Sequence, residues 1–181
     1  MKNVKIGLIG FGTIGAGVVK ILADNAEVIR QRLGATLEVG RIADLDITTD
    51  RGVQVGKGVL TTDANAVLED PEIEIVIELI GGYEPARSFV LKALQNGKHV
   101  VTANKALLAK HGEEIFSAVD QKGLSIGFEA AVGGAIPIIR TSHCHHETKH
   151  AVATIIQLPG NWKSTRANHT TLTSTSSDAQ T

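Results

Sequence analysis

Three glycines near the start of the chain have the type and spacing to hold a phosphate. They are Gly10, Gly12 and Gly15, in the stretch LIGFGTIGAG, and they form the pattern GxGxxG. In a turn between a strand and a helix, the first glycine permits the tight bend, the second lets the backbone approach a pyrophosphate, and the third lets the helix pack closely. Three glycines can also fall into this pattern by chance and make a corner that binds nothing.

The stretches on either side favour the phosphate-binding interpretation. VKIGLIG, residues 4–10, is a short apolar run typical of a buried strand, and TIGAGVVKILADN, residues 13–25, is typical of a helix. The N–H groups of Phe11, Thr13 and Ile14 would then be free at the positive end of the helix dipole, where phosphates bind. We therefore expect a dinucleotide site at this turn.

A dinucleotide also needs an anchor for its adenosine ribose, usually an acidic residue at the end of the second strand. Asp44 or Asp46 could supply it, although Asp44 follows Gly15 by 29 positions, where the rule expects ~20. These aspartates could equally be solvated turn residues. Three basic side chains nearby could instead bind the 2′-phosphate of NADP: Arg41, Arg51 and Lys57. The sequence therefore does not distinguish NAD from NADP as the cofactor.

Lys105 stands between an apolar run, KHVVTAN, and the helical stretch that follows it. An ammonium group there faces the positive end of the helix dipole and partial burial, and both disfavour its charge. A lysine so placed can act as an acid or base near neutral pH. On chain position alone, a solvated surface lysine is the somewhat better interpretation.

Glu129 lies among small residues in FEAAVGGAIP, with two glycines close behind it. A carboxylate beside exposed carbonyl oxygens has the composition of a hard-cation site. A glycine-rich loop that contacts a cofactor or crosses to another domain has the same amino-acid composition. The residues alone favour the loop.

Short apolar runs alternate with helical stretches, which predicts a doubly wound α/β fold with a parallel sheet covered on both faces. The first helix has apolar residues at helical spacing, namely Ile14, Val18, Ile21 and Leu22. The stretch EVIRQRLGATLE, residues 27–38, would extend this helix. Strands are expected at residues 4–10, 37–46, 58–62, 72–82, 98–104 and 124–134, with further helices at 84–97 and 105–123. Because ligands bind outside the carboxyl ends of such strands, ELIGGYEP, VVTANKALL and FEAAVGGAIP should converge.

The composition is that of a globular protein with one main domain: 181 residues, 43% hydrophobic and 20% charged. A formal net charge of −1 gives no reason to expect nucleic acid or an anionic membrane as partner, and a small polar ligand fits better. The single cysteine, Cys144, excludes an internal disulfide framework. Since no apolar run approaches the roughly 18 residues of a membrane span and no cleavable signal is recognised, we expect a cytoplasmic protein.

Four stretches, in this order and at these spacings, resemble the nucleotide-binding domain of homoserine dehydrogenase: GLIGFGTIGAGVVKIL, VIELIGGYEPAR, HVVTANKALLAKHG and FEAAVGGAIPIIR. The resemblance covers residues 4–140 and implies a Rossmann-type NAD(P)-binding domain over residues 1–140. That family interconverts L-aspartate 4-semialdehyde and L-homoserine with NADPH or NADH, on the route to threonine, methionine and isoleucine. Its members form homo-oligomers, whereas the oligomeric state of this chain stays open.

The resemblance also assigns roles to residues in three turns. It implies that cofactor contacts come from Gly10, Phe11, Gly12, Thr13, Ile14 and Gly15, from Ile80, Gly81 and Gly82, and from Ala103, Asn104 and Lys105. Lys105 matches the family lysine associated with proton transfer, which reverses the surface interpretation. Glu129 matches a ligand of a monovalent cation, typically sodium, together with backbone carbonyls: Val132, Gly134 and Ile136.

The resemblance stops after Arg140. Residues 141–181 lack the motifs of the family's catalytic region, and ten of the 22 residues from Gly160 onward are Ser or Thr, a composition that does not build a core. We expect a divergent, poorly ordered tail from a truncated or frameshifted reading frame, with the family's catalytic domain largely absent. The chain is then a truncated or inactive fragment of the enzyme or, alternatively, a non-catalytic dinucleotide-binding module or sensor.

Overall fold

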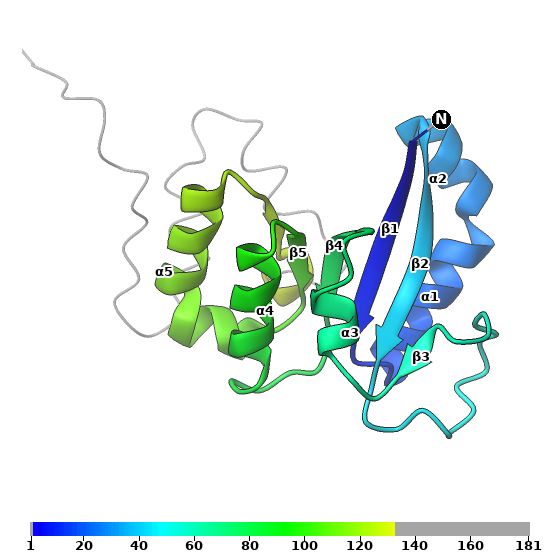
Figure 1. Ribbon diagram of the computed structural model, residues 1–181, viewed down its shortest axis with the longest axis horizontal. Helices are drawn as coiled ribbons and strands as arrows, with labels where there is room; N and C mark the ends of the chain where they lie inside the picture. The colour runs from blue at the N-terminus through cyan, green and yellow to red at the C-terminus, as the bar shows by residue number, and fades with distance from the viewer. Residues whose placement is uncertain (1, 133–181) are drawn as a thin grey trace, which may run out of the picture.

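The computed structural model describes residues 2–132, in which strands and helices alternate along the chain (Figure 1). The strands are β1 (Lys2–Ile9), β2 (Ala35–Ala43), β3 (Leu60–Thr61), β4 (Ile73–Glu78), β5 (His99–Thr102) and β6 (Ile126–Gly127). The helices are α1 (Thr13–Asp24), α2 (Ala26–Leu33), α3 (Asn65–Leu68), α4 (Ala86–Gln95), α5 (Lys105–Lys122) and α6 (Glu129–Val132). The segment 141–181 lies outside the described residues.

The six strands form one parallel sheet in the order β3-β2-β1-β4-β5-β6. The chain moves outward from β1 to β3, returns past β1, and then moves outward again from β4 to β6. Helices α1 and α2 lie on one side, and α4 and α5 lie on the other (Figure 1). This is the doubly wound fold expected from the sequence, and its strand order is that of dinucleotide-binding folds.

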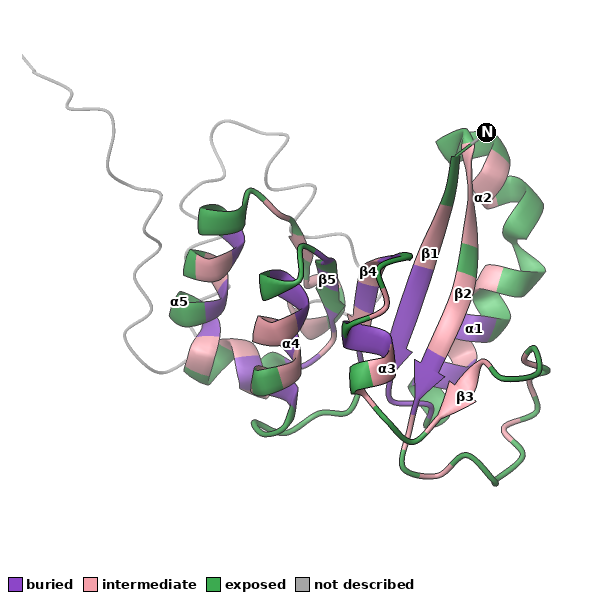
Figure 2. Ribbon diagram, viewed as in Figure 1, coloured by how far each residue is buried: buried purple, intermediate pink, exposed green. Residues whose placement is uncertain are grey.

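Apolar residues fill both faces of the sheet. One cluster joins α1 to β1 and β2, and a larger one joins α3, α4 and α5 to β1, β4 and β5. Strand β1 contributes to both through adjacent residues, Leu8 to the first and Ile9 to the second, because successive side chains of a strand point to opposite faces. Figure 2 shows buried residues along β1 and on the inner sides of α3, α4 and α5.

The connection from β1 to β2 uses two helices where the sequence predicted one long helix. The chain breaks at Asn25, and α2 then ends at Gly34, which has φ +67°. Glycine adopts this left-handed conformation without steric cost and commonly ends a helix. As a result β2 begins at Ala35, earlier than the expected start at residue 37.

Helix α1 buries a different side from the one that its apolar spacing indicated. Its buried residues are the small or short Gly15, Ala16 and Val19, whereas Ile14 and Ile21 are 63% and 61% exposed. Short side chains let a helix approach the sheet closely, so packing distance outweighs hydrophobicity at this position. The spacing rule correctly indicated a helix. Of the four apolar residues it selected, Val18 and Leu22 are half-buried, and the buried side is centred instead on Gly15, Ala16 and Val19.

The sixth strand is much shorter than the predicted segment 124–134. It pairs with β5 only at Ile126 and Gly127, and the next residues form α6, because the sequence Glu-Ala-Ala favours helix over strand. Phe128, between the two elements, packs edge to face against Phe116 of α5 with 5.3 Å between ring centroids. The chain therefore leaves the sheet at Phe128.

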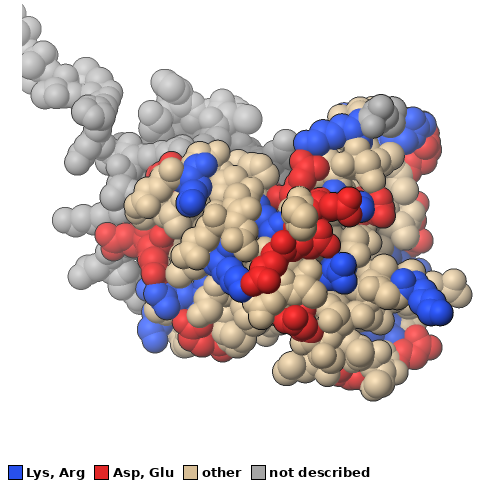
Figure 3. Space-filling view, viewed as in Figure 1, with Lys and Arg blue, Asp and Glu red and all other residues tan. Residues whose placement is uncertain are grey.

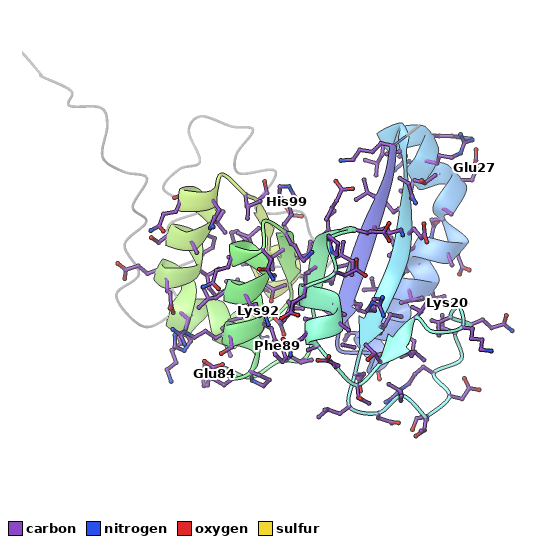
Figure 4. The ribbon with its side chains drawn as sticks, in the orientation of Figure 1. Lys20, Glu27, Glu84, Phe89, Lys92 and His99 are labelled. Atoms are coloured by element: carbon purple, nitrogen blue, oxygen red, sulfur yellow. The ribbon has the colours of Figure 1, made fainter. Side chains whose placement is uncertain are left out.

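Charged side chains of both signs are interspersed on the face shown in Figure 3, in keeping with the net charge of −1. Figure 4 shows Lys92 on α4 and, on the far side of the sheet, Lys20 and Glu27 on α1 and α2. The Lys92 ammonium ties α4 to α3 by donating to Asn65 and Glu69, at 2.7 and 2.6 Å. Among residues 2–132, no helix combines the length and apolar character needed to cross a membrane.

Candidate functional site

The carboxyl ends of β1 and β4 form the switch point of the sheet, since the chain leaves these neighbouring strands in opposite directions. Ligands of open α/β sheets bind outside this point. The turn after β1 is fixed there from both sides, because Gly10 N–H donates to Ala43 O and Leu79 N–H donates to Ile9 O, each at 2.8 Å. The arrowheads of β1 and β2 mark this edge at the bottom of Figure 1.

Each glycine of the first turn has a separate structural reason. Gly10 has φ +102°, and a Cβ added to it would lie 2.9 Å from the carbonyl carbon of Leu79. A Cβ on Gly15 would overlap the carbonyl oxygen of Gly10. Gly12 instead has no atom within 4 Å of such a Cβ, and it precedes α1 without a capping side chain. The N-terminus of α1 is therefore open to an approaching phosphate.

The N–H groups at the start of α1 differ in their availability. Thr13 and Ile14 are exposed, and first-turn N–H groups have no acceptor within their own helix. The N–H of Phe11, by contrast, donates to a carboxylate oxygen of Asp44, so the expectation that it is free is wrong. The Phe11 side chain is 4% exposed and belongs to the core.

Asp44 follows β2 directly and binds the glycine turn. One of its carboxylate oxygens accepts from Phe11 N–H, and the other accepts from Asp46 N–H at 2.8 Å. The residue is half-buried, so it is more than a solvated turn residue. Each carboxylate oxygen retains a second lone pair that can accept a ribose hydroxyl.

The three basic residues near β2 are engaged to different degrees. Arg51 forms an ion pair with Asp46 at 2.9 Å, and Arg41 forms one with Asp70 at 3.4 Å. Lys57 is exposed. Within residues 2–132, the Nε atom of Arg51 is buried without a hydrogen-bond partner. Asp44 and the guanidinium of Arg51 therefore both come from the segment after β2, where an adenosine ribose would lie, whereas Arg41 is paired with Asp70 just before β4.

The turn after β4 lies against the glycine turn. A Cβ on Gly10 would be 3.0 Å from Cγ2 of Ile80, and the next two residues, Gly81 and Gly82, have φ +72° and +71°. Two consecutive left-handed residues are readily available only to glycine. All three residues from Ile80 to Gly82 are exposed at this edge.

Glu78, the last residue of β4, binds this turn from within the protein. It is fully buried, with 0% exposure. Its Oε1 accepts from Ile80 N–H at 3.0 Å and from Gly81 N–H at 3.2 Å, and its Oε2 accepts from the Thr102 hydroxyl at 2.6 Å. The ends of β4 and β5 are joined through this carboxylate.

Asn104 connects the same turn to α5. Its side-chain amide donates to Gly82 O at 2.7 Å and its side-chain oxygen accepts from Leu107 N–H at 3.0 Å, which caps the helix. Lys105 is the first residue of α5 and is exposed, while Ala103 is half-buried. The turns 80–82 and 103–105 therefore meet as expected, although Lys105 is more open than the partial burial that we anticipated.

The described part of the cation segment consists of Glu129 and Val132, the first and last residues of α6. Glu129 is half-buried, and Gly134 and Ile136 lie outside the described residues. Within residues 2–132, no group of three or more His, Cys, Asp or Glu residues could hold a metal ion. A site made of one carboxylate and backbone carbonyls stays a prediction.

Sequence reasoning missed Glu78 and Thr102. The available signal was a glutamate inside the apolar run IEIVIELI, because a strand buried on both faces leaves a carboxylate in need of partners. Glu74, four positions earlier, also lies between apolar residues of this run, but it is an accessible partner of Lys2. The sequence alone does not separate the two glutamates.

The parallel strand order, the glycine turn and the adjoining turn held by Glu78 define a dinucleotide-binding α/β domain. The family model described as homoserine dehydrogenase, NAD binding domain, matches residues 10–129. The chain belongs to this family.

Individual relatives agree with the family match. The chain is 49% identical over 140 residues to a homoserine dehydrogenase of Pseudomonas aeruginosa and 42% identical over 141 residues to that of Bacillus subtilis, covering 77% and 78% of this chain. A homoserine dehydrogenase structure from Thiobacillus denitrificans superposes with a TM-score of 0.73 and 50% identity over 78% of this chain. These matches cover 32%, 33% and 33% of the relatives, so the chain spans about a third of their length.

Proposed function

We propose that this chain is the cofactor-binding part of a homoserine dehydrogenase and that it holds NADPH or NADH at the switch point of the sheet. The observation that carries the proposal is the glycine turn, which is open at Gly12 and contacts Ile80 of the turn Ile80–Gly82 through Gly10. The pyrophosphate binds along Gly10–Gly15, where Thr13 and Ile14 offer N–H groups. The nicotinamide lies against Ile80, Gly81 and Gly82, next to Ala103, Asn104 and Lys105.

The reaction that fits this family is the interconversion of L-homoserine and L-aspartate 4-semialdehyde. When bound, the nicotinamide supplies or takes a hydride at the substrate carbon. Lys105 gives a proton to the aldehyde oxygen during reduction and takes it from the hydroxyl during oxidation. Its exposed position at the start of α5 leaves the ammonium accessible to a substrate.

Two finer features belong to the same proposal. Glu129 and the carbonyl of Val132 bind a monovalent cation such as sodium, together with Gly134 and Ile136. Asp44 accepts the ribose hydroxyls of NADH, whereas the guanidinium of Arg51 can meet the extra phosphate of NADPH. Comparing the two nucleotides on the same chain decides between these two ribose contacts.

The test is a fluorescence titration of the purified 181-residue chain with NADPH and with NADH, followed by an assay of L-homoserine oxidation at the absorbance of the reduced nicotinamide. We expect binding without measurable turnover, because the chain spans about a third of its relatives. Lys105→Ala should weaken binding, while Lys110→Ala, on the same helix, should not. Failure of the wild-type chain to bind either nucleotide would refute the proposal.

A second candidate is a dinucleotide-binding module or sensor without catalysis, and the short span relative to the homologues favours it. Growth complementation of cells that lack homoserine synthesis tests the non-catalytic candidate, because restored growth would show that the chain is an active enzyme. An oxidation rate that Lys105→Ala abolishes and Lys110→Ala preserves would exclude the non-catalytic module.

A further inference from the structure

The carboxylate of Glu78 is the most deeply buried charged group at the candidate site. Among the residues that the structure describes, the buried polar or charged side chains are Glu78, Lys98, Thr102 and Asn104. Three of these four lie at the carboxyl ends of β4 and β5, and they are hydrogen-bonded to one another or to the turn that follows β4. Burying a carboxylate costs far more than burying an apolar side chain, so the arrangement calls for an explanation beyond packing.

The hydrogen bonds of Glu78 all run in one direction. The carboxylate only accepts, and it takes the N–H groups of Ile80 and Gly81 as well as the Thr102 hydroxyl. Because Thr102 donates its proton to Glu78, its oxygen is free to accept from Asn104 N–H at 3.0 Å. A glutamine at position 78 has only one acceptor oxygen, so it can accept either from the two backbone N–H groups or from the Thr102 hydroxyl, and one of these sites loses its acceptor.

This chain of bonds joins the two turns on which the proposed nicotinamide contacts depend. From Thr102 it passes to Asn104, whose side chain returns to Gly82 O and also caps α5 through Leu107 N–H. Lys105 follows Asn104 directly. The position of the turn Ile80–Gly82 and the start of the helix that carries Lys105 are therefore set by one buried carboxylate.

We propose that Glu78 is a positioning residue for the nicotinamide half of the cofactor. It orients the turn Ile80–Gly82 and, through Thr102 and Asn104, the first residue of α5. This inference rests on the proposed function. It predicts an effect concentrated on the nicotinamide half, because the hydrogen bonds of the glycine turn that receives the pyrophosphate do not use the Glu78 side chain. They run from Phe11 N–H to Asp44, from Gly10 N–H to Ala43 O and from Leu79 N–H to Ile9 O.

The experiment compares two ligands on the full chain: NADPH, and 2′-phospho-ADP-ribose, which lacks the nicotinamide. Glu78→Gln should weaken the binding of NADPH by roughly tenfold, the equivalent of about one lost hydrogen bond to a charged group. It should weaken the binding of 2′-phospho-ADP-ribose by less than about twofold. The fluorescence of bound NADPH should also change, since it reports the surroundings of the nicotinamide. Glu74→Gln, the same change at an accessible position of β4, should leave both affinities unchanged.

A second pair of variants covers the case in which Glu78→Gln does not fold. Thr102→Val removes the hydroxyl and should reproduce the selective loss of NADPH affinity. Thr102→Ser retains the hydroxyl and should bind NADPH with the affinity of the wild-type chain. Equal losses for both ligands, or no loss for either, would overturn the role of Glu78 while wild-type binding of NADPH still stands. Absence of NADPH binding by the wild-type chain would overturn the proposed function and this role with it.

Discussion

The glycines of the first turn are distinguished by what surrounds each of them. Gly10 and Gly15 are confined by neighbouring backbone atoms, whereas Gly12 faces open space. A substitution at a confined glycine acts on the folded protein itself, and one at Gly12 acts only when a ligand approaches. Folding and binding effects can therefore be separated within a single turn.

We predict that Gly12→Ala leaves the free energy of unfolding within about 0.5 kcal/mol of wild type and weakens NADPH binding by at least tenfold, roughly one hydrogen bond's worth. Gly15→Ala should cost about 1–3 kcal/mol, because its methyl group overlaps the Gly10 carbonyl oxygen. Gly17→Ala, in the open interior of α1, is the control and should stabilise by about 0.5–1 kcal/mol. Urea unfolding and nucleotide titration measure both effects. Undiminished binding by Gly12→Ala would contradict the assigned role of this residue.

At the scale of elements, a buried lysine secures the amino end of β4. Lys98, just before β5, is 4% exposed, and its ammonium donates to Asp70 O at 2.5 Å and to Ile73 O at 2.8 Å. Burial lowers the pKa of Lys98, and the nearby Asp70 opposes this shift. The hydrogen bonds join the loop before β4 to β5, so the lysine acts as a structural tie.

We predict that Lys98→Met lowers the free energy of unfolding by about 1–3 kcal/mol, because two carbonyl oxygens lose their donor. Urea denaturation at pH 7 measures the loss. Lys2→Met removes an exposed ion pair with Glu74 and should change the free energy by less than about 1 kcal/mol. Equal effects of the two variants would show that burial of Lys98 is unimportant.

The lowered pKa of Lys98 also predicts a pH dependence. The unfolded chain binds this proton more tightly than the folded chain, so the free energy of unfolding rises as pH increases from the folded pKa towards the ordinary lysine value. Lys98→Met should lack this part of the rise.

At the scale of the whole molecule, the two apolar clusters share β1. Leu8 packs on the side of α1, and the adjacent Ile9 packs on the side of α4. A strand that belongs to both clusters cannot leave one without disturbing the other. We therefore expect the described domain to unfold as one cooperative unit.

We predict that Leu94→Ala, a fully buried change in α4, lowers global stability by about 2–5 kcal/mol. Native-state hydrogen exchange should register the same loss at Ile42 N–H in β2 as at Val100 N–H in β5, although Val100 belongs to the altered cluster and Ile42 belongs to the other one. Leu45→Ala, at a position that is 93% exposed, should alter neither by more than about 0.5 kcal/mol. Loss of protection confined to β5 would show that the two faces unfold independently.

The sequence by itself determined the alternation of strands and helices, the glycine turn and the meeting of the turns after β4 and β5. The alternation and the glycine turn follow from local spacing and glycine conformation in short stretches such as residues 8–17. The meeting of the two turns follows from the rule that ligands bind outside the carboxyl ends of parallel strands. Only the tertiary structure decided that α1 buries its small residues, that Phe11 N–H is taken by Asp44, and that Glu78 binds Thr102. The partners in these two hydrogen bonds are 33 and 24 positions apart. Their contact depends on the order of strands in the sheet, which no local pattern encodes.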